Sequence, residues 1–116
     1  MSAIEELHLS GVNMGDTGIA LLTSGREYSC LTNLELPNSN IGDLGVEHLS
    51  TSHAFPRLRR LNLRRNRVGP RGVELLCASY LATQLDYLNV DYNDEFMTPE
   101  ATGRLVAVFG YDKLWY

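Results

Sequence analysis

The stretch "LRRLNLRRNRVGPRGVELL", residues 58–76, combines the features that decide the fold of this chain. It opens with an apolar–x–x–apolar–x–apolar pattern that ends at Leu61 and Leu63, and these two positions alternate with polar ones. Alternation with a period of two is expected of a short strand that buries one face. Gly69 and Gly72 then introduce apolar residues at helical spacing. The stretch therefore predicts a strand, a loop and a helix in that order.

The same arrangement recurs along the chain at an interval of 27 residues. Three apolar columns keep this register: Ile4, Leu31, Leu58 and Leu85; Leu7, Leu34, Leu61 and Leu88; Leu9, Leu36, Leu63 and Val90. A fixed period of this length is typical of stacked units, each of which cannot bury its apolar face alone. We expect a single domain over residues 1–116, with repeats over residues 4–30, 31–57, 58–84 and 85–112 and a terminal strand over residues 113–116.

The loops and helix starts of the units are also similar in composition. An apolar residue anchors each loop: Met14, Ile41, Val68 and Met97. A Gly–x–x–Gly pair follows in the first three units; we expect its first glycine to permit a strained turn and its second to permit close backbone packing. Asp16 and Asp43 are expected to cap the helices that they begin, and Pro70 is expected in a first helical turn.

The fourth unit departs from this register. About two extra residues near Asp94 and Glu95 are expected to delay its helix until Thr98 and Pro99. The helices of all four units are expected to bury apolar residues along one face: Ile19, Leu21 and Leu22; Val46 and Leu49; Val73, Leu75 and Leu76; Leu105, Val106 and Val108.

In these features the chain resembles the leucine-rich-repeat proteins, whose pattern "LxxLxLxxNxLGxxGxxxL" is matched closely by residues 58–76. The long helical half with its glycine pair is similar to the ribonuclease-inhibitor-type subclass. The resemblance implies an α/β fold, a right-handed solenoid in a horseshoe arc, with parallel strands on the concave face and helices on the convex face. It implies about four repeats and a carboxy-terminal half-repeat. Right-handed strand–helix–strand crossovers lead to the same architecture.

The resemblance also implies a loop asparagine that satisfies backbone groups of adjacent repeats. Asn66 and Asn93 match this position, whereas Ser39 and Val12 stand there in the second and first repeats. The first repeat is therefore expected to be atypical, as terminal repeats tend to be.

The first strand is expected to lie at a poorly protected edge, because only three residues precede Ile4. Exposed strand edges invite pairing, and solenoids usually need caps. Three explanations remain open: the sequence is a fragment of a longer array, the chain self-associates through this edge, or Met1–Ala3 form a small irregular cap.

The composition is that of an ordinary globular domain, with 44% hydrophobic and 21% charged residues and a formal net charge of −4. No apolar run approaches the roughly 18 residues of a membrane span, and the amino terminus lacks the shape of a signal peptide. Two cysteines cannot form a disulfide framework. These features predict a cytoplasmic protein, and the mild acidity argues against general binding to nucleic acid or membranes.

No catalytic or metal-binding constellation is evident. The spacing of His8, His48 and His53 matches no standard zinc motif, and Cys30 and Cys77 have no second ligand nearby in the sequence, so both are expected to be packed thiols. The glycine pairs recur in each of the first three units and lack the lysine of a phosphate-binding loop. Polar segments such as "GREYS" are expected to be return loops. We therefore predict a protein that is not an enzyme and has no cofactor or metal.

What remains is the outward surface of the strands, which the register locates. Strand residues two apart share a face, so the residues between the buried leucines are expected to line the concave face, and the strand ends to form its rims. Repeats three and four contribute the most distinctive side chains. The predicted partner-binding residues are Glu35, Arg59, Arg60, Asn62, Arg64, Arg65, Tyr87, Asn89, Asp91 and Tyr92.

Seven of the ten basic residues belong to the third repeat or its entry: Arg57, Arg59, Arg60, Arg64, Arg65, Arg67 and Arg71. In adjacent strands, Arg59 should lie beside Asp86 and Arg64 beside Asp91, while Arg60 and Arg65 should stack on Tyr87 and Tyr92. Arg67 should approach Asp94. This ladder is partly self-neutralising, yet exposed ion pairs are weak enough to leave the arginines available for binding.

The sequence thus favours a protein–protein interaction module that binds a partner, expected to carry an acidic segment, through the concave face of repeats three and four. One alternative is a structural segment of a longer array that self-associates through its amino-terminal edge. A minor alternative is a phosphate or nucleic-acid ligand on the arginine stripe, which neighbouring carboxylates disfavour.

Overall fold

The computed structural model describes residues 4–9, 13–93 and 95–116 of the chain. Strands and helices alternate through most of this length. Their order and bounds are β1 (Glu6–His8), α1 (Gly15–Thr23), β2 (Asn33–Glu35), α2 (Asp43–Thr51), β3 (Arg60–Asn62), α3 (Pro70–Ala78), α4 (Leu81–Gln84), β4 (Tyr87–Asn89), α5 (Pro99–Phe109) and β5 (Leu114–Trp115). The short α4, which lies in the return of the third unit, is the one element of this series that the sequence did not predict.

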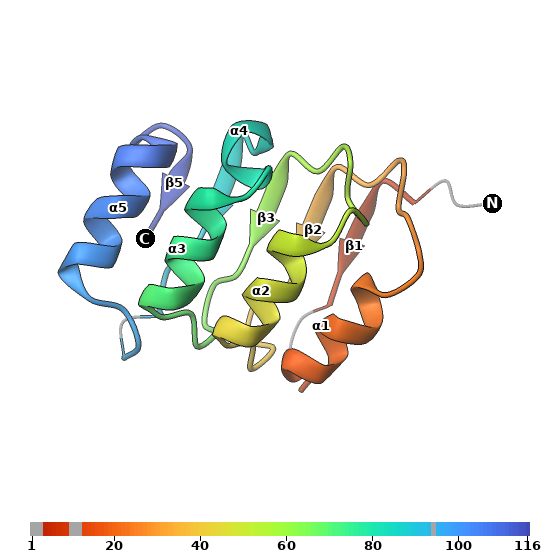
Figure 1. The fold of residues 1–116 in the computed structure, drawn as a ribbon, viewed down its shortest axis with the longest axis horizontal. Coiled ribbons are helices and arrows are strands. Elements are labelled where there is room, and N and C mark those ends of the chain that lie inside the picture. The colour runs from red at the N-terminus through yellow and green to blue at the C-terminus, as the bar shows by residue number, and fades with distance from the viewer. Residues whose placement is uncertain (1–3, 10–12, 94) are drawn as a thin grey trace.

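The strands form one parallel sheet in the order β1-β2-β3-β4-β5 (Figure 1). The pairing follows the 27-residue register, because Leu7, Leu34, Leu61 and Leu88 are successive partners across the first four strands. The last strand, β5, pairs Leu114 with Leu88 of β4. The repeat boundaries, the exact repeat count and the horseshoe arc stay predictions.

Helices α1, α2, α3 and α5 lie side by side along one face of the sheet (Figure 1). The opposite face carries no helix of the described chain, and we refer to it as the open face. Apolar columns of the strands therefore point toward the helices, and polar residues between them point away, as the period of two requires.

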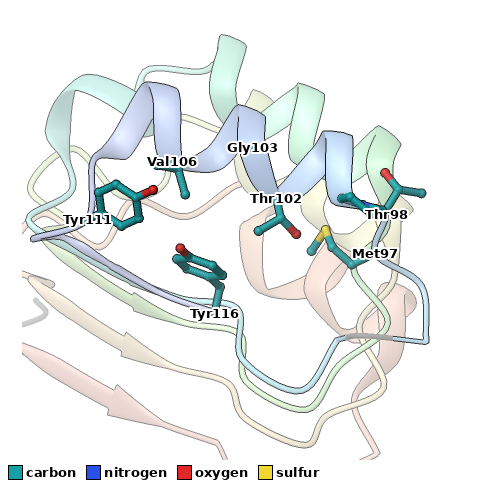
Figure 2. Close-up of a pocket in the computed structure, with 8 residues that line it drawn as sticks. Met97, Thr98, Thr102, Gly103, Val106, Tyr111 and Tyr116 are labelled. Carbon is teal, nitrogen blue, oxygen red and sulfur yellow. The ribbon is translucent and has the colours of Figure 1, made fainter.

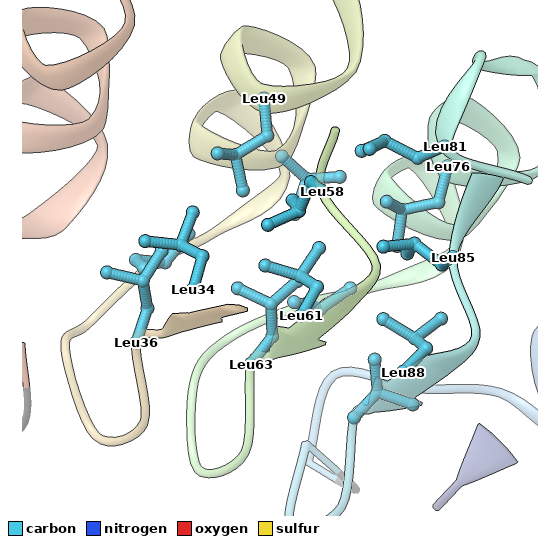
Figure 3. Packing of buried hydrophobic residues seen from close by; sticks show 14 of the residues in the cluster. Leu34, Leu36, Leu49, Leu58, Leu61, Leu63, Leu76, Leu81, Leu85 and Leu88 are labelled. Carbon is cyan, nitrogen blue, oxygen red and sulfur yellow. The ribbon is translucent and has the colours of Figure 1, made fainter. Parts of the chain in front are cut away.

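The core lies between the two layers and is built from the repeated leucines (Figure 3). Leu34, Leu61 and Leu88 are each 0% exposed. Burial is weaker at the β1 edge, where Ile4 is 42% exposed and Leu7 is half-buried. The amino-terminal edge is thus less protected than the interior, as predicted.

Not every residue predicted in the core lies there. Leu21 is 73% exposed, because the core-facing side of α1 is supplied by Ile19 and Leu22 one turn apart. Cys30 is also exposed and is not the packed thiol expected from the sequence.

The "GREYS" segment contributes to the core, contrary to the prediction of a merely polar return loop. Tyr28 is buried and stacks on Phe55, with ring centroids 5.4 Å apart. The two residues are 27 positions apart, so they form a further apolar column on the return side of the repeats. The spacing contained this signal, although the surrounding polar residues obscured it.

The helix-start aspartates do cap helices, but not their own. The Oδ1 atom of Asp16, in α1, accepts hydrogen bonds from the backbone N–H groups of Gly42 (2.7 Å) and Gly45 (2.9 Å) at the start of α2. Asp43, in α2, accepts one from the N–H of Gly69 (2.7 Å) at the start of α3. Each carboxylate therefore satisfies orphan donors of the next helix and links adjacent repeats.

We call these contacts, in which Asp16 and Asp43 each cap the next helix, the aspartate relay. They explain the second glycine of each Gly–x–x–Gly pair. A Cβ atom added to Gly45 would lie 2.6 Å from Asp16 Oδ1, and one added to Gly72 would lie 2.6 Å from Asp43 Oδ1. The second glycine thus makes room for the preceding aspartate. The predicted strained turn at the first glycine is found at Gly15 (φ 64°) but not at Gly42 (φ −107°), where the conformation is ordinary.

The relay ends where Pro70 takes the position of the aspartate. Pro70 lies in the first turn of α3, as predicted, and offers no carboxylate to the helix that follows. Helix α5 is capped instead by its own Thr98, whose side chain accepts a hydrogen bond from the N–H of Ala101 (3.2 Å). The helix starts at Pro99, two residues later than the register requires, as predicted.

The loop asparagines bind adjacent repeats together, as the family resemblance implied. Asn66 Oδ1 accepts from the N–H groups of Ser39 and Ile41, each at 3.0 Å, and Asn66 Nδ2 donates to the carbonyl of Leu36 at 2.8 Å. Asn93 makes equivalent bonds one repeat later. Ser39 substitutes in part, since its hydroxyl donates to the carbonyl of Leu9. Val12 and the predicted cap of Met1–Ala3 lie outside the described residues.

Candidate partner-binding surface

Two rows of side chains cross the open face in strand register. One row runs through Glu6, Asn33, Arg60 and Tyr87, and the other runs through His8, Glu35, Asn62, Asn89 and Trp115. The rows change from acidic at β1 and β2 to basic and aromatic at β3 and β4. Trp115 is 58% exposed and extends the aromatic part to the last strand. The sequence analysis placed this residue in a terminal strand but did not predict its contribution to the surface.

Arg60 stacks on Tyr87 as predicted. The guanidinium carbon of Arg60 lies 4.1 Å from the centroid of the Tyr87 ring. The parallel register places these residues directly opposite one another, and the ring face attracts the cation. A planar guanidinium that lies on a ring keeps its N–H edges available for other acceptors.

Tyr92 is flanked by two guanidinium groups just beyond the end of β4. The guanidinium carbons of Arg64 and Arg65 lie 4.7 Å and 4.8 Å from its ring centroid. The contact with Arg65 was predicted, whereas the contact with Arg64 was not. We call Arg60, Arg64, Arg65, Tyr87 and Tyr92 the arginine–tyrosine surface.

The predicted ion pairs on this surface are absent from the described residues. Arg59 does not pair with Asp86; its Nη1 donates to the carbonyl of Gln84 at 3.2 Å. The carboxylate of Asp91 accepts from the backbone N–H of Tyr92 at 3.1 Å, which turns it toward its own loop and away from Arg64. These local backbone acceptors and donors, together with the tyrosine rings, replace the expected charge ladder.

The ion pairs that the described residues do form lie elsewhere: His8 with Glu6, Arg71 with Glu47, and Arg104 with Glu74. The guanidinium groups of Arg60, Arg64 and Arg65 therefore form no ion pair with a carboxylate among the described residues, although the charge of Arg60 helps to lower the pKa of the Glu6 carboxyl. The expected contact of Arg67 with Asp94 involves a residue outside them, and Arg67 lies over the ring of Phe96 at 5.5 Å.

Several predicted binding residues shape the surface from within. Asn62 Nδ2 donates to Glu35 Oε1 at 2.9 Å, and Asn62 Oδ1 accepts from the N–H of Arg64 at 2.9 Å. Asn89 Oδ1 accepts from the N–H of Asp91 in the same way, and Asn89 is buried. These amides hold the strand ends in place, so their role in the surface is to orient the turns that carry the arginines and Tyr92.

The amino-terminal part of the open face has its own polar contacts. A hydrogen bond between the His8 ring and Glu6, at 3.0 Å, lowers the pKa of the Glu6 carboxyl. The neighbouring Asn33 Oδ1 is buried and has no hydrogen-bond partner within the described part of the chain. This acidic end faces the same side as the arginines, so the open face has opposite charges at its two ends.

A pocket of about 330 Å³ lies at the rim beside the arginine–tyrosine surface. We call it the rim pocket; its lining residues are Asn38, Arg65, Asn66, Tyr92, Glu95 and Phe96. Phe96 is 37% exposed and was missed by sequence reasoning, because it falls in the inserted segment of the fourth unit, where no register applies.

A larger pocket of about 650 Å³ lies between α5 and the end of the chain (Figure 2). Met97, Thr102, Val106, Tyr111 and Tyr116 contribute to its lining.

The described residues contain no group of three or more His, Cys, Asp or Glu side chains that could hold a metal ion. Burial raises the pKa of the half-buried Cys77 thiol, which favours the neutral form over the reactive thiolate. None of the described helices is both long and apolar enough to cross a membrane.

Comparison with known families is consistent with this geometry. A family model described as Leucine Rich repeat matches residues 57–77, which cover β3, its loop and most of α3. No curated protein matches the chain significantly.

Proposed function

We propose that the chain is a non-catalytic protein-binding module of the leucine-rich-repeat kind and that its partner docks on the open face over β3 and β4. The family match over residues 57–77 and the parallel sheet support this proposal, since leucine-rich-repeat domains generally mediate protein–protein interaction. The observation that carries the proposal is that Arg60, Arg64 and Arg65 rest on tyrosine rings and form no ion pair among the described residues. We also place the chain in the ribonuclease-inhibitor-type subclass and in the cytoplasm, where its two free thiols would stay reduced.

The chemistry of the surface favours an acidic protein segment as the ligand. Guanidinium groups bind carboxylates through two parallel hydrogen bonds, and the contacts with Tyr87 and Tyr92 already restrict the positions of these groups. Less side-chain entropy is then lost on binding. Arginine and tyrosine are also the residue types that contribute most to interface energies. Nucleic acid fits less well, since Glu35, Asp86 and Asp91 lie around the arginines and would repel a polyanion.

Partner capture by the immobilised protein, followed by quantitative mass spectrometry, tests this proposal. Charge reversal at Arg60 and Arg64 should remove the captured partner while leaving the melting temperature within about 2 °C, since exposed charges contribute little to stability. The matched control reverses Arg71 and Arg104, two exposed arginines of the helical layer, and should retain capture. Equal capture by wild type and both double variants would show that the partner does not use the open face.

The β1 edge supports a second candidate, self-association. β1 is the first strand of the sheet, and Leu7 and Leu9 beneath it are only partly buried, so a second copy could pair along this edge. Size-exclusion chromatography with light scattering from about 1 to 500 μM would detect it. A monomeric mass over the whole range would exclude self-association in this range.

A further inference from the structure

The turns at the rim hold bulky residues in an unfavourable backbone conformation. Asn38, Arg65 and Tyr92 occupy the same position in three successive repeats and have φ angles of 53°, 57° and 58°. Asparagine tolerates this left-handed region, whereas arginine and tyrosine rarely adopt it. The backbone fixes the turns, because the N–H of Asn38 donates to the carbonyl of Arg64 and the N–H of Arg65 donates to the carbonyl of Asp91, each at 2.9 Å.

Stability alone does not account for arginine and tyrosine at these two positions. Asparagine at either one would satisfy the same backbone with less strain, as Asn38 does one repeat earlier. Both side chains are instead directed outward, and Tyr92 is 52% exposed. Strained residues that point into solvent beside a pocket are a recurrent property of functional sites.

The rim pocket offers charge and apolar surface together. Arg65, Tyr92 and the partly exposed Phe96 are among its lining residues, and the guanidinium of Arg67 lies over the Phe96 ring. Arg64 and Arg65 present two guanidinium groups around Tyr92. Glu95 also lines the pocket and limits how much negative charge it can accept. A single carboxylate next to an apolar side chain fits this combination, whereas a multiply charged phosphate chain does not.

We propose that the rim pocket is the specificity site of the partner-binding surface and binds a protein segment in which an aspartate or glutamate adjoins an aromatic or large aliphatic residue. The carboxylate accepts hydrogen bonds from Arg64 and Arg65 beside Tyr92, and the apolar side chain packs on Phe96. This inference rests on the proposed function, because it names the kind of partner segment that the open face would hold.

A random dodecapeptide library displayed on phage tests the inference without knowledge of the partner. Selection on the wild-type protein should enrich an acidic residue adjacent to an aromatic or aliphatic one. Fluorescent copies of the enriched peptides should lose at least tenfold in affinity between 50 and 300 mM NaCl, as expected of an arginine–carboxylate contact. No enrichment, or enrichment of basic or purely apolar peptides, would overturn the inference.

The register supplies a matched variant for the same test. Arg65→Asn combined with Tyr92→Asn copies the residue found at position 38, so the turns should keep their conformation while the pocket loses its cation and its ring. The enriched peptides should bind this variant at least tenfold more weakly, and Arg71→Asn should bind them like the wild type.

Two outcomes separate this inference from the proposed function. Peptides that bind the Arg65→Asn/Tyr92→Asn variant normally but fail to bind an Arg60→Glu variant would overturn the rim pocket and leave the open face as the binding surface. Peptides that bind both variants normally would overturn both. Circular dichroism melting of each variant establishes that it is folded before binding is measured.

Discussion

Asn66 and Arg65 are neighbours in one turn, yet they differ in almost every physical respect. Asn66 is buried, and its amide makes four hydrogen bonds, three of them to the preceding repeat. Arg65 is exposed, has a φ of 57° and has no carboxylate partner among the described residues. Asn93 and Tyr92 show the same contrast one repeat later.

The contrast shows how a repeat separates folding from recognition within three or four residues. The inward loop asparagines are hydrogen-bonded to the adjacent repeat, and their spacing follows the register because each one must meet fixed backbone groups there. Outward groups meet no such requirement, so they are free to vary and to accept local strain. Substitutions on the two sides should therefore differ in the size and even the sign of their effect on stability.

Removal of the inward amide should have the largest effect. Asn66→Ala leaves the N–H groups of Ser39 and Ile41 and the carbonyl of Leu36 without partners in a buried loop. We expect a loss of about 3 kcal/mol or more in the free energy of unfolding, measured by urea denaturation. Asn13→Ala, at an exposed asparagine, is the control and should change stability by less than about 0.5 kcal/mol. A loss below 1 kcal/mol for Asn66→Ala would show that water replaces the amide readily. It would contradict the view that the inward residue of this turn is the one that stabilises the fold.

The aspartate relay should give the next largest effect, and it can be tested by a double-mutant cycle. Asp43→Ala removes the acceptor for the N–H of Gly69 and should cost about 1 kcal/mol. Gly72→Ala places a Cβ atom 2.6 Å from Asp43 Oδ1 and should cost about 1–3 kcal/mol. The double variant should be more stable than the sum of the single losses implies, because removal of the carboxylate also removes most of the clash. Strict additivity would show that the glycine is not required by the aspartate.

The sequence predicted those parts of the molecule that the register controls. The strand positions, their pairing and the leucine columns all follow from a single 27-residue period, whereas the role of the loop asparagines was implied by the family resemblance. The delayed start of α5 was also foreseen, because Thr98 and Pro99 are strong helix-start residues by themselves.

Features that depend on a second repeat were predicted less well. A capping aspartate looks the same in the sequence whether it caps its own helix or the next one, and only the stacking distance of the repeats decides between them. The arginines were placed on the correct strands, but their partners were not. Asp86 and Asp91 are the register neighbours of Arg59 and Arg64, yet a backbone carbonyl binds Arg59 and a backbone N–H binds Asp91 instead. Phe96 and the rim pocket lie in the insertion, where periodicity gives no information.

Replacement of the outward residues should affect stability little, in contrast to Asn66. The Arg65→Asn/Tyr92→Asn variant relieves left-handed strain of about 1 kcal/mol at each site and loses cation–π contacts of about 0.5–1 kcal/mol each. We therefore expect a free energy of unfolding within about 1 kcal/mol of wild type, with any change toward greater stability. Urea denaturation measures this change. A loss above 2 kcal/mol would mean that these side chains are structural and that the division within the turn is wrong.

The two thiols offer the mildest test of the same division, because they differ in burial but not in chemistry. Cys30 is exposed, whereas Cys77 lies on α3 and is half-buried, so that its pKa is raised; its Sγ contacts the carbonyl of Arg104 in α5 at 4.0 Å. At pH 8 a smaller fraction of Cys77 is therefore thiolate, and we expect Cys30 to react with an aromatic disulfide reagent about tenfold faster or more. The variants Cys30→Ser and Cys77→Ser assign each rate.

Two controls test the cause of the difference in reaction rate. The two rates should become equal in denaturant, because the raised pKa of Cys77 belongs only to the folded state. They should also approach one another as the pH rises and both thiols ionise. Equal rates in the folded protein at pH 8 would show that the helical layer opens at α3 on the timescale of the reaction, and the inward side of the repeat would then be less rigid than its hydrogen bonds imply.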